Sequence, residues 1–441
     1  MFDSKVLLDQ LNTTVKNTTT FQVSGKLTKV IGMVLESNGP KAPIGEVCVL
    51  KDRNGKEICK SEIVGFKDEN RILSMVLGDL QNISPGMEIK ALGESLKVNC
   101  SENMLGRVLD GLGNPLDGKE DIKPEERRSV YASPPNPLLR NRIFEPIATG
   151  VKAIDSMLTI GKGQRVGVFS GSGVGKSTLM GMIARNTSAD INVIALVGER
   201  GREVKEFIEN DLGPEGLQRS VVVVATSDSP ALVRVKAALV ATTIAEFFRD
   251  KGLDVMLMMD SSTRLAMAQR EVGLTIGEPP TSKGYTPSVF SLFQKTMERA
   301  GNSDKGSITG LYTVLVEGDD FNEPISDAAR GILDGHIMLS RKLASMGHYP
   351  AIDVLESISR VMKHVVSKEH QNSAMKLKQL LSVYRSAEDL ISVGAYQKGT
   401  NPKLDKAVQM NEKINDFLTQ DTDDQINYED VINELIELGS M

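Results

Sequence analysis

Residues 165–179 read Arg-Val-Gly-Val-Phe-Ser-Gly-Ser-Gly-Val-Gly-Lys-Ser-Thr-Leu, and the rest of the chain is organised around them. Its apolar start predicts a short buried strand, and the residues from Lys176 onward predict a helix. A strand, a glycine-rich turn and a helix that opens on Lys176 and Ser177 have the pattern of a phosphate-binding loop. The flanking strand and helix favour this interpretation over an ordinary glycine-rich turn.

Each residue type in this loop has a chemical reason. Gly171, Gly173 and Gly175 are expected to allow positive backbone dihedrals, so that successive N–H groups turn toward phosphate oxygens. Lys176 would supply a charge to the outer phosphates, and the Ser177 hydroxyl would bind magnesium. The predicted nucleotide-binding residues are Gly171, Ser172, Gly173, Val174, Gly175, Lys176, Ser177 and Thr178.

One position departs from the general pattern. The pattern begins with glycine, and this chain has Ser170 there. The departure does not affect the residues that would contact phosphate or magnesium.

Composition narrows the class of protein. The chain has 441 residues, 25% of them charged, and a formal net charge of −6 from 52 basic and 58 acidic residues. An acidic chain without Trp lacks the basic, aromatic-rich surface of a nucleic-acid binder. Three cysteines and four histidines without zinc-ligand spacing, no apolar run long enough to span a membrane and no signal peptide predict a reduced, cytoplasmic location.

The chain divides by pattern into five segments. Residues 1–20 have the apolar spacing of an amphipathic helix, which would either pack on its own domain or dock on a partner. Residues 21–98 hold short β-branched runs, such as Lys29–Leu35, between turn signals and predict a β-barrel. Residues 99–150 read as a hairpin and a Pro-rich linker.

Residues 151–365 alternate strands with helices, which predicts an α/β domain with a mostly parallel sheet. The expected strands are Ile191–Val197, Val221–Ala225, Val255–Met259 and Ile308–Val316, with a long helix from Pro230 to Phe248. Residues 366–441 predict a small helical domain with helices over Lys368–Gly394, Pro402–Leu418 and Tyr428–Leu438, the last ended by Gly439.

Polar residues follow two of the predicted strands. Glu199 and Arg200 come after the strand ending at Val197, and Asp260 ends the apolar run Val255–Met259. Ligands gather at the carboxyl ends of parallel strands. A strand-ending aspartate after a phosphate-binding loop is the second nucleotide motif, in which the carboxylate holds magnesium.

The chain resembles a known family from about residue 21 to its end. Barrel, linker, nucleotide core and helical tail resemble the catalytic subunits of rotary ATP synthases. Several stretches resemble type III secretion ATPases more specifically: 170–177, 198–203, 277–288, 317–324, 333–341 and 348–353. The strongest resemblance is to the flagellum-specific ATPases, the flagellar type III protein export ATPases, and residues 392–399 favour it.

The resemblance implies roles for residues of the core. Glu199 matches the carboxylate that polarises the attacking water, and Arg200 matches a contact to the γ-phosphate. Asp260, with Ser177, matches the magnesium position. Without the motif, Glu199 would be a solvated glutamate and Arg200 a member of a surface ion pair.

Two further residues are carried over from the same resemblance. Tyr349, in His-Tyr-Pro, matches the aromatic residue that stacks on adenine, where the alternative is core packing. Arg360, in Ser-Ile-Ser-Arg, matches the arginine finger that enters the neighbouring subunit's site; an isolated arginine would more often be a surface charge. With Lys176, Glu199 and Arg200, Arg360 completes the expected catalytic set.

The resemblance also implies an assembly. Glu199 and Arg360 lie on one chain, so identical copies could complete each site in a homohexamer. The expected ligands are ATP and Mg²⁺. Expected partners are a regulatory, peripheral-stalk-like export protein bound through residues 1–20, a central-stalk-like export protein, the membrane export gate and chaperone–substrate complexes, at the cytoplasmic side of the inner membrane. No nucleic acid is expected.

Three other readings remain open. A virulence type III secretion ATPase would share the chemistry. A non-catalytic nucleotide-binding ring subunit would share the fold, although Glu199 argues against it. A ring-shaped nucleic-acid translocase would share the core and the finger, although the acidic balance argues against it.

Overall fold

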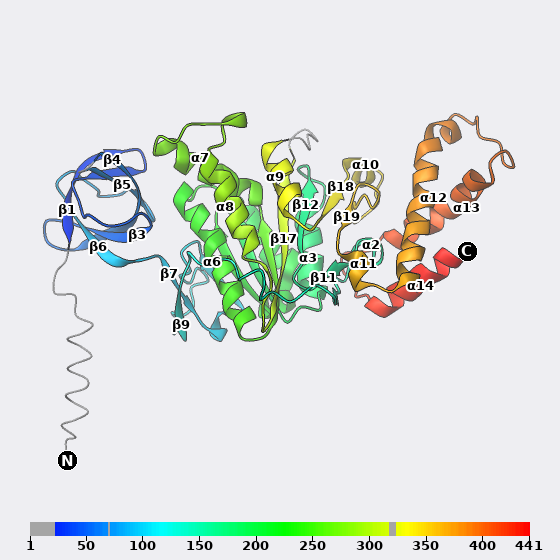
Figure 1. Cartoon of the computed structure of the whole chain (residues 1–441), viewed down its shortest axis with the longest axis horizontal. Helices are drawn as coiled ribbons and strands as arrows, with labels where there is room; N and C mark the ends of the chain where they lie inside the picture. The colour runs from blue at the N-terminus through cyan, green and yellow to red at the C-terminus, as the bar shows by residue number, and fades with distance from the viewer. Residues whose placement is uncertain (1–22, 69–70, 317–322) are drawn as a thin grey trace, which may run out of the picture. The chain divides into compact units, whose positions relative to one another are not determined.

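The computed structural model describes residues 23–68, 71–316 and 323–441 (Figure 1). It forms two compact units that divide between Leu96 and Lys97. The predicted partner-binding helix of residues 1–20 lies outside the described residues.

The first unit is a closed six-stranded barrel, as the short β-branched runs predict. Its strands follow the order β1-β2-β5-β4-β3-β6. Their bounds are β1 Ser24–Ile31, β2 Val34–Ser37, β3 Glu46–Lys51, β4 Glu57–Asp68, β5 Arg71–Val76 and β6 Glu88–Ser95. The run Lys29–Leu35 is not one strand, because the chain reverses at Gly32, whose φ is 56°. Leu27, Leu35, Leu50 and Ile89 form its core.

The second unit is built on a nine-stranded sheet. Eight of its strands follow the order β19-β18-β12-β17-β15-β13-β14-β8, and the ninth, β16, pairs with β17. All neighbours from β18 to β8 are parallel, and β19 and β16 are antiparallel. The bounds are β8 Arg107–Asp110, β12 Arg165–Ser170, β13 Ile191–Val197, β14 Ser220–Ala225, β15 Asp254–Asp260, β16 Gly301–Asn302, β17 Ser307–Leu315, β18 Gly335–Leu339 and β19 Ile358–Ser359. The predicted mostly parallel sheet is confirmed.

Strand β8 comes from the segment expected to be a hairpin and a linker. It pairs in parallel with β14 at the edge of the large sheet. The expected tight turn follows it, and the Asp110 carboxylate accepts hydrogen bonds from the N–H groups of Leu112, at 2.9 Å, and Asn114, at 2.8 Å. The sequence predicts this local turn, whereas the pairing with β14 joins residues far apart in the chain.

Short elements connect the sheet to its surroundings. Two small antiparallel pairs are β7 Lys97–Cys100 with β9 Glu126–Ser129, and β10 Pro146–Ile147 with β11 Ile160–Gly161. Short helices are η1 Glu102–Met104, α2 Lys152–Met157, α4 Gly201–Glu206, the π-helix η2 Phe207–Leu212, α5 Gly213–Gln218, η3 Ser282–Gly284, α10 Arg341–Ser345 and α11 Met362–Val365.

Longer helices cover both faces of the sheet (Figure 1). They are α3 Lys176–Asn186, α6 Ala231–Asp250, α7 Ser262–Thr275, α8 Pro287–Glu298 and α9 Pro324–Ile332. Helix α3 shares a buried cluster with Val168, Ile194 and Met258 of the strands. Helix α6 packs on β13, β14 and β15 and is buried along nearly its whole length. The sheet is thus the middle of three layers, with helices on both of its faces.

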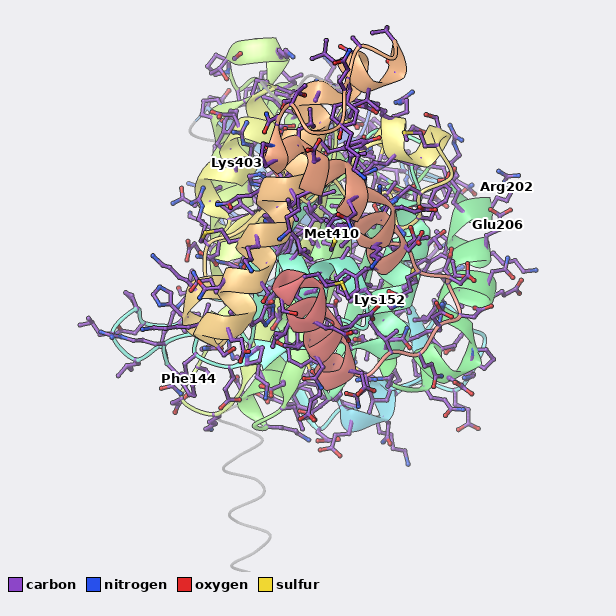
Figure 2. The ribbon with its side chains drawn as sticks, turned by 90° about the vertical axis from the view of Figure 1, so that its right-hand side faces the viewer. Phe144, Lys152, Arg202, Glu206, Lys403 and Met410 are labelled. Atoms are coloured by element: carbon purple, nitrogen blue, oxygen red, sulfur yellow. The ribbon has the colours of Figure 1, made fainter. Side chains whose placement is uncertain are left out.

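The C-terminal region is helical, as predicted, with α12 Lys368–Ser392, α13 Pro402–Leu418 and α14 Tyr428–Ser440. Side chains of Ser367, Asn401 and Asn427 cap the N-termini. Figure 2 looks onto these helices and shows Lys152, at the start of α2, beside Met410 of α13. Among the described residues, no helix is both long and apolar enough to cross a bilayer.

Gly439 does not end the last helix, as its residue type suggested. Helix α14 continues through it to Ser440, and Gly439 is buried against α12. A Cβ at Gly439 would lie 2.6 Å from the Ser373 Cβ. Glycine is therefore required here by close packing of two helices.

This contact predicts the effect of adding one methyl group. Gly439→Ala should lower the free energy of unfolding by about 1–3 kcal/mol, because overpacking outweighs the better helix propensity of alanine. The matched control is Gly331→Ala in α9, where a Cβ meets nothing within 4 Å. The control should be neutral or stabilising by up to about 1 kcal/mol. Urea unfolding measures both, and equal effects of the two substitutions would contradict the packing argument.

Candidate functional site

The glycine-rich loop lies at the carboxyl end of β12, between Ser170 and the first residue of α3, Lys176. Gly173 and Gly175 have φ values of 76° and 90°, in the left-handed region that favours glycine. Gly171 does not adopt a positive φ, so the expectation for that glycine is wrong. Two left-handed glycines are enough to turn the loop back onto the start of the helix.

The side chains of the loop divide between core and solvent. Val174 is buried and anchors the loop in the core, whereas Ser172 and Ser177 are exposed. The Thr178 side chain hydrogen-bonds Asp211 of η2. In the first turn of α3, the Ser177 hydroxyl is therefore the one exposed to a ligand, because the Thr178 hydroxyl is hydrogen-bonded to Asp211.

Lys176 reaches the end of another strand. Its Nζ donates to Oδ1 of Asp260, the last residue of β15, at 2.5 Å. Thr313 of β17 donates its hydroxyl to the same oxygen at 2.8 Å. Asp260 is only 3% exposed. Loop and strand end are thus joined by a partly buried ion pair, and Thr313 holds the carboxylate in place.

Glu199 approaches the same lysine from the next strand. It follows β13 and is 8% exposed, with Oε1 at 3.9 Å from the Lys176 Nζ and 3.2 Å from the Arg264 Nε. Burial and the negative charge of Asp260 raise the pKa of Glu199 to about 7, although Lys176 acts in the opposite direction. Oε1 makes no hydrogen bond to the described residues. The site therefore holds a carboxylate oxygen with spare acceptor capacity.

Two contributors to this cluster were not predicted. Arg264, on α7, and Thr313, on β17, approach the carboxylates from separate elements. Arg264 lies one helical turn after the cap that follows Asp260, and that position in the sequence could have indicated it. No local pattern points to Thr313, because its contact depends on the pairing of β15 with β17.

Arg200 lies beside this cluster and points outward. Its side chain is 74% exposed and its Nη1 is 3.3 Å from Oε1 of Glu203. Glu203 also hydrogen-bonds Glu199, and this contact lowers the pKa of Glu203. In this conformation Arg200 makes a surface ion pair and does not contact Lys176 or Asp260.

Tyr349 lies beside the loop. Its ring atoms Cδ1 and Cε1 are 3.8 Å from the point where a Cβ on Gly175 would stand. Tyr349 is 45% exposed, so its ring does not pack in the hydrophobic core. Its aromatic surface stands next to the start of α3, where a flat group could stack on it.

Arg360 lies at the other end of the sheet. Its N–H donates to the Asp334 carbonyl oxygen at 3.0 Å, and Asp334 pairs with Arg165, the first residue of β12. The loop follows the last residue of that strand, roughly 17 Å away at about 3.3 Å per residue. The exposed Arg360 side chain donates to the Arg330 carbonyl oxygen at 3.1 Å. Within one chain, the structure does not bring Arg360 to Lys176.

The donors at the loop suit a magnesium nucleotide. Magnesium takes oxygen ligands, usually one or two from carboxylates together with substrate phosphates. Asp260 and the Ser177 hydroxyl provide such oxygens, and the Lys176 ammonium already shows that the Asp260 carboxylate binds a cation. Backbone N–H groups at the start of α3 favour phosphate.

Family descriptions match three stretches of the chain. Residues 150–359 match the nucleotide-binding domain of the ATP synthase alpha/beta family, and residues 27–93 match its beta-barrel domain. Residues 366–437 match the C-terminal domain of the type III secretion ATPase EscN. Together they cover barrel, core and helical region.

Individual relatives match over nearly the whole length. The chain is 55% identical to a flagellum-specific ATP synthase of Bacillus subtilis, over 96% of this chain and 97% of that protein. It is 49% identical to a type 3 secretion system ATPase of Xanthomonas euvesicatoria, over 93% of each. The assembled EscN of enteropathogenic Escherichia coli, solved with its central stalk EscO, is 45% identical with a TM-score of 0.87, over 94% of this chain and all of that one.

The environment of Glu199 predicts a pH dependence of stability. The folded, nucleotide-free chain keeps the Glu199 proton up to about pH 7, whereas the unfolded chain releases it near 4.5. The stabilising contribution is complete below pH 4.5 and is lost as the pH rises to about 7. Relative to Glu199→Gln, the wild type should lose about 1–3 kcal/mol across this range. Urea unfolding at several pH values measures the difference.

The exposed Glu215→Gln is the matched control. It should follow the wild type at every pH. A Glu199→Gln variant that also parallels the wild type would show that the Glu199 carboxyl is not perturbed.

Proposed function

The chain belongs to the ATP synthase alpha/beta family, and we propose that it is the ATPase of a flagellar type III protein export apparatus, working as a homohexamer. As a member of this family it is an ATPase. The identities to the Bacillus and Xanthomonas relatives, 55% and 49%, favour the flagellar apparatus over a virulence secretion system.

The reaction is attack of water on the γ-phosphate of ATP. Loop N–H groups and Lys176 stabilise charge on the phosphates, and Arg200 turns from Glu203 toward the γ-phosphate. Glu199 orients the water through the oxygen that lacks a hydrogen bond, and it accepts the proton when ionised. Tyr349 stacks on the adenine.

Ser177 and Asp260 would hold magnesium, which neutralises phosphate charge when bound. For this, Lys176 has to leave Asp260 and turn to the phosphates. Thr313 keeps the Asp260 carboxylate in position after the lysine has moved.

The position of Arg360 is the main observation that supports a homohexamer. It lies at the amino end of the sheet, beside the Arg165–Asp334 pair, while the loop lies at the carboxyl end. A finger at this position serves a neighbouring copy, not its own loop. Assembly of the EscN relative with a central stalk supports such a ring and a central-stalk-like partner.

Other parts of the proposal concern partners and domain roles. Residues 1–20 bind a regulatory, peripheral-stalk-like export protein, and the ring receives chaperone–substrate complexes at the export gate. It does so in the cytoplasm, attached to the inner membrane only through the export apparatus. The domains of the proposed ATPase are residues 21–98, 99–150, 151–365 and 366–441.

Mixing two inactive variants tests the shared site. Glu199→Gln and Arg360→Ala should each lower ATP hydrolysis by about 10³-fold or more while leaving ATP binding intact. In a one-to-one mixed ring, about a quarter of the interfaces should combine an intact Glu199 with an intact Arg360, so activity should return to about a quarter of wild type. Steady-state phosphate release measures it.

The matched control mixes Glu199→Gln with the double variant carrying both substitutions. It offers no intact Glu199 and should stay inactive. Lys176→Ala provides the blank. A first mixture that stays as inactive as the control would show that each chain completes its own site.

A genetic test addresses the export apparatus. In the organism that encodes this chain, its deletion should abolish flagellar filaments, because rod, hook and filament subunits no longer leave the cell. The wild-type gene should restore them, and Lys176→Ala, at equal protein level, should restore at most a small fraction. Normal filaments in the deletion strain, with loss of secreted effectors, would assign the chain to a virulence system. Electron microscopy of cells gives the readout.

A further inference from the structure

Gln420 is a buried polar residue in a loop of the C-terminal region. It is 4% exposed and lies between α13 and α14, far from the phosphate-binding loop in sequence. Its side-chain amide is fully used: Oε1 accepts from the Lys152 N–H at 2.9 Å, and Nε2 donates to the Gly150 carbonyl oxygen at 3.0 Å. A buried amide with both ends paired is strongly oriented.

The backbone of the same residue holds Tyr349. The Gln420 N–H donates to the Tyr349 carbonyl oxygen at 2.9 Å. The next residue back reinforces this contact, since the Thr419 hydroxyl lies 3.4 Å from Nδ1 of His348. The Tyr349 ring in turn stands beside Gly175, at the N-terminal end of α3. Gln420 therefore connects to the phosphate-binding loop through one residue.

The other partner of Gln420 lies at the opposite end of the same helix. Gly150 has a φ of 73°, and a Cβ there would lie 2.2 Å from the Cβ of Asn186, the last residue of α3. Arg185 of α3 also donates to the Thr422 carbonyl oxygen at 2.6 Å, within the same C-terminal loop. The loop of Gln420 thus contacts the segments at both ends of the helix that carries Lys176.

We propose that Gln420 is a positioning residue for nucleotide: its amide fixes the loop between α13 and α14 to Gly150 and Lys152, and the loop holds Tyr349 at the distance from Gly175 at which a base can stack. The inference rests on the proposed role of Tyr349 in ATP binding. It assigns to the C-terminal helical region an indirect part in base recognition, through Tyr349. Gln420 touches no reacting atom and acts through Tyr349.

The test replaces the amide without leaving a cavity. Gln420→Met keeps the length of the side chain and removes both hydrogen bonds, so the loop loses its attachment to Gly150 and Lys152. We expect KM for ATP and the dissociation constant of ATP to rise about tenfold, the effect of one buried hydrogen-bonded group, with kcat changed less than threefold. Gln420→Glu keeps the acceptor for Lys152 and places a carboxylate oxygen against the Gly150 carbonyl; it should raise KM as well.

Two further readouts separate positioning from a general loss of structure. Binding of inorganic tripolyphosphate, which has no base, should be the same in Gln420→Met and wild type. In a double-mutant cycle, Tyr349→Ala and Gln420→Met should be non-additive on ATP affinity, because both remove the same stacking contact. The exposed Gln425→Met, on the same loop, is the matched control and should bind ATP like wild type.

The outcomes are distinct. Unchanged ATP affinity in Gln420→Met overturns the proposal, as does an equal loss of tripolyphosphate binding or full additivity with Tyr349→Ala. If Tyr349→Ala itself leaves ATP binding unchanged, Tyr349 does not stack and the proposal falls with it. A wild type that binds ATP without hydrolysing it overturns the proposed function alone, because the binding measurements still decide the role of Gln420.

Discussion

The site depends on one partly buried lysine between two carboxylates. Lys176 pairs closely with Asp260 and only distantly with Glu199, at 2.5 and 3.9 Å. A buried carboxylate is costly unless a cation or hydrogen-bond donors compensate it. Thr313 helps Asp260, whereas Glu199 keeps an oxygen without a hydrogen bond and a pKa raised to about 7. This unequal sharing makes one carboxylate suited to a cation and the other suited to a water molecule and its proton.

The parallel sheet separates the candidate site residues into two groups. The carboxyl ends of parallel strands lie on the same side of the sheet. The loop after β12, Glu199 after β13 and Asp260 at the end of β15 therefore come together. Arg360 follows β19, which runs antiparallel to the other strands, and it therefore lies at the amino end of the parallel strands. Strand direction therefore keeps Arg360 away from the loop of its own chain. If Arg360 acts as the proposed arginine finger, it has to act on a neighbouring copy.

The C-terminal helices are attached to the nucleotide core by polar contacts as well as by apolar packing. His370 of α12 lies 2.7 Å from the Ser156 carbonyl oxygen, and Gln420 binds the turn before α2. Both contacts fall on α2 or its start, which connects to the end of α3 through Gly150. A movement of the helical region would therefore displace the segments that contact both ends of α3, the helix that carries Lys176.

Several features followed from local patterns in the sequence. The glycine loop between β12 and α3, the strand ending in Asp260 and the three C-terminal helices are encoded by neighbouring residues, through glycine placement, apolar runs and capping side chains. Predictions from local patterns were wrong where the conformation of a residue depends on a contact that is distant in sequence. Gly439 suggested a helix end, yet Ser373 on another helix requires glycine inside α14. Gly32 reverses a run that its residue types made look continuous.

The amino-acid sequence alone predicted the fold class, the order of the domains and the family, because these depend on short motifs and periodicities. The three-dimensional fold was needed to show that Arg264 and Thr313 join the carboxylates and that β8 extends the large sheet. It was also needed to show that Arg360 lies away from its own loop and that Gln420 contacts Tyr349. Each of these depends on strand order or on packing between elements distant in the chain. Such contacts leave no local pattern, because the two partners are selected by their position in space.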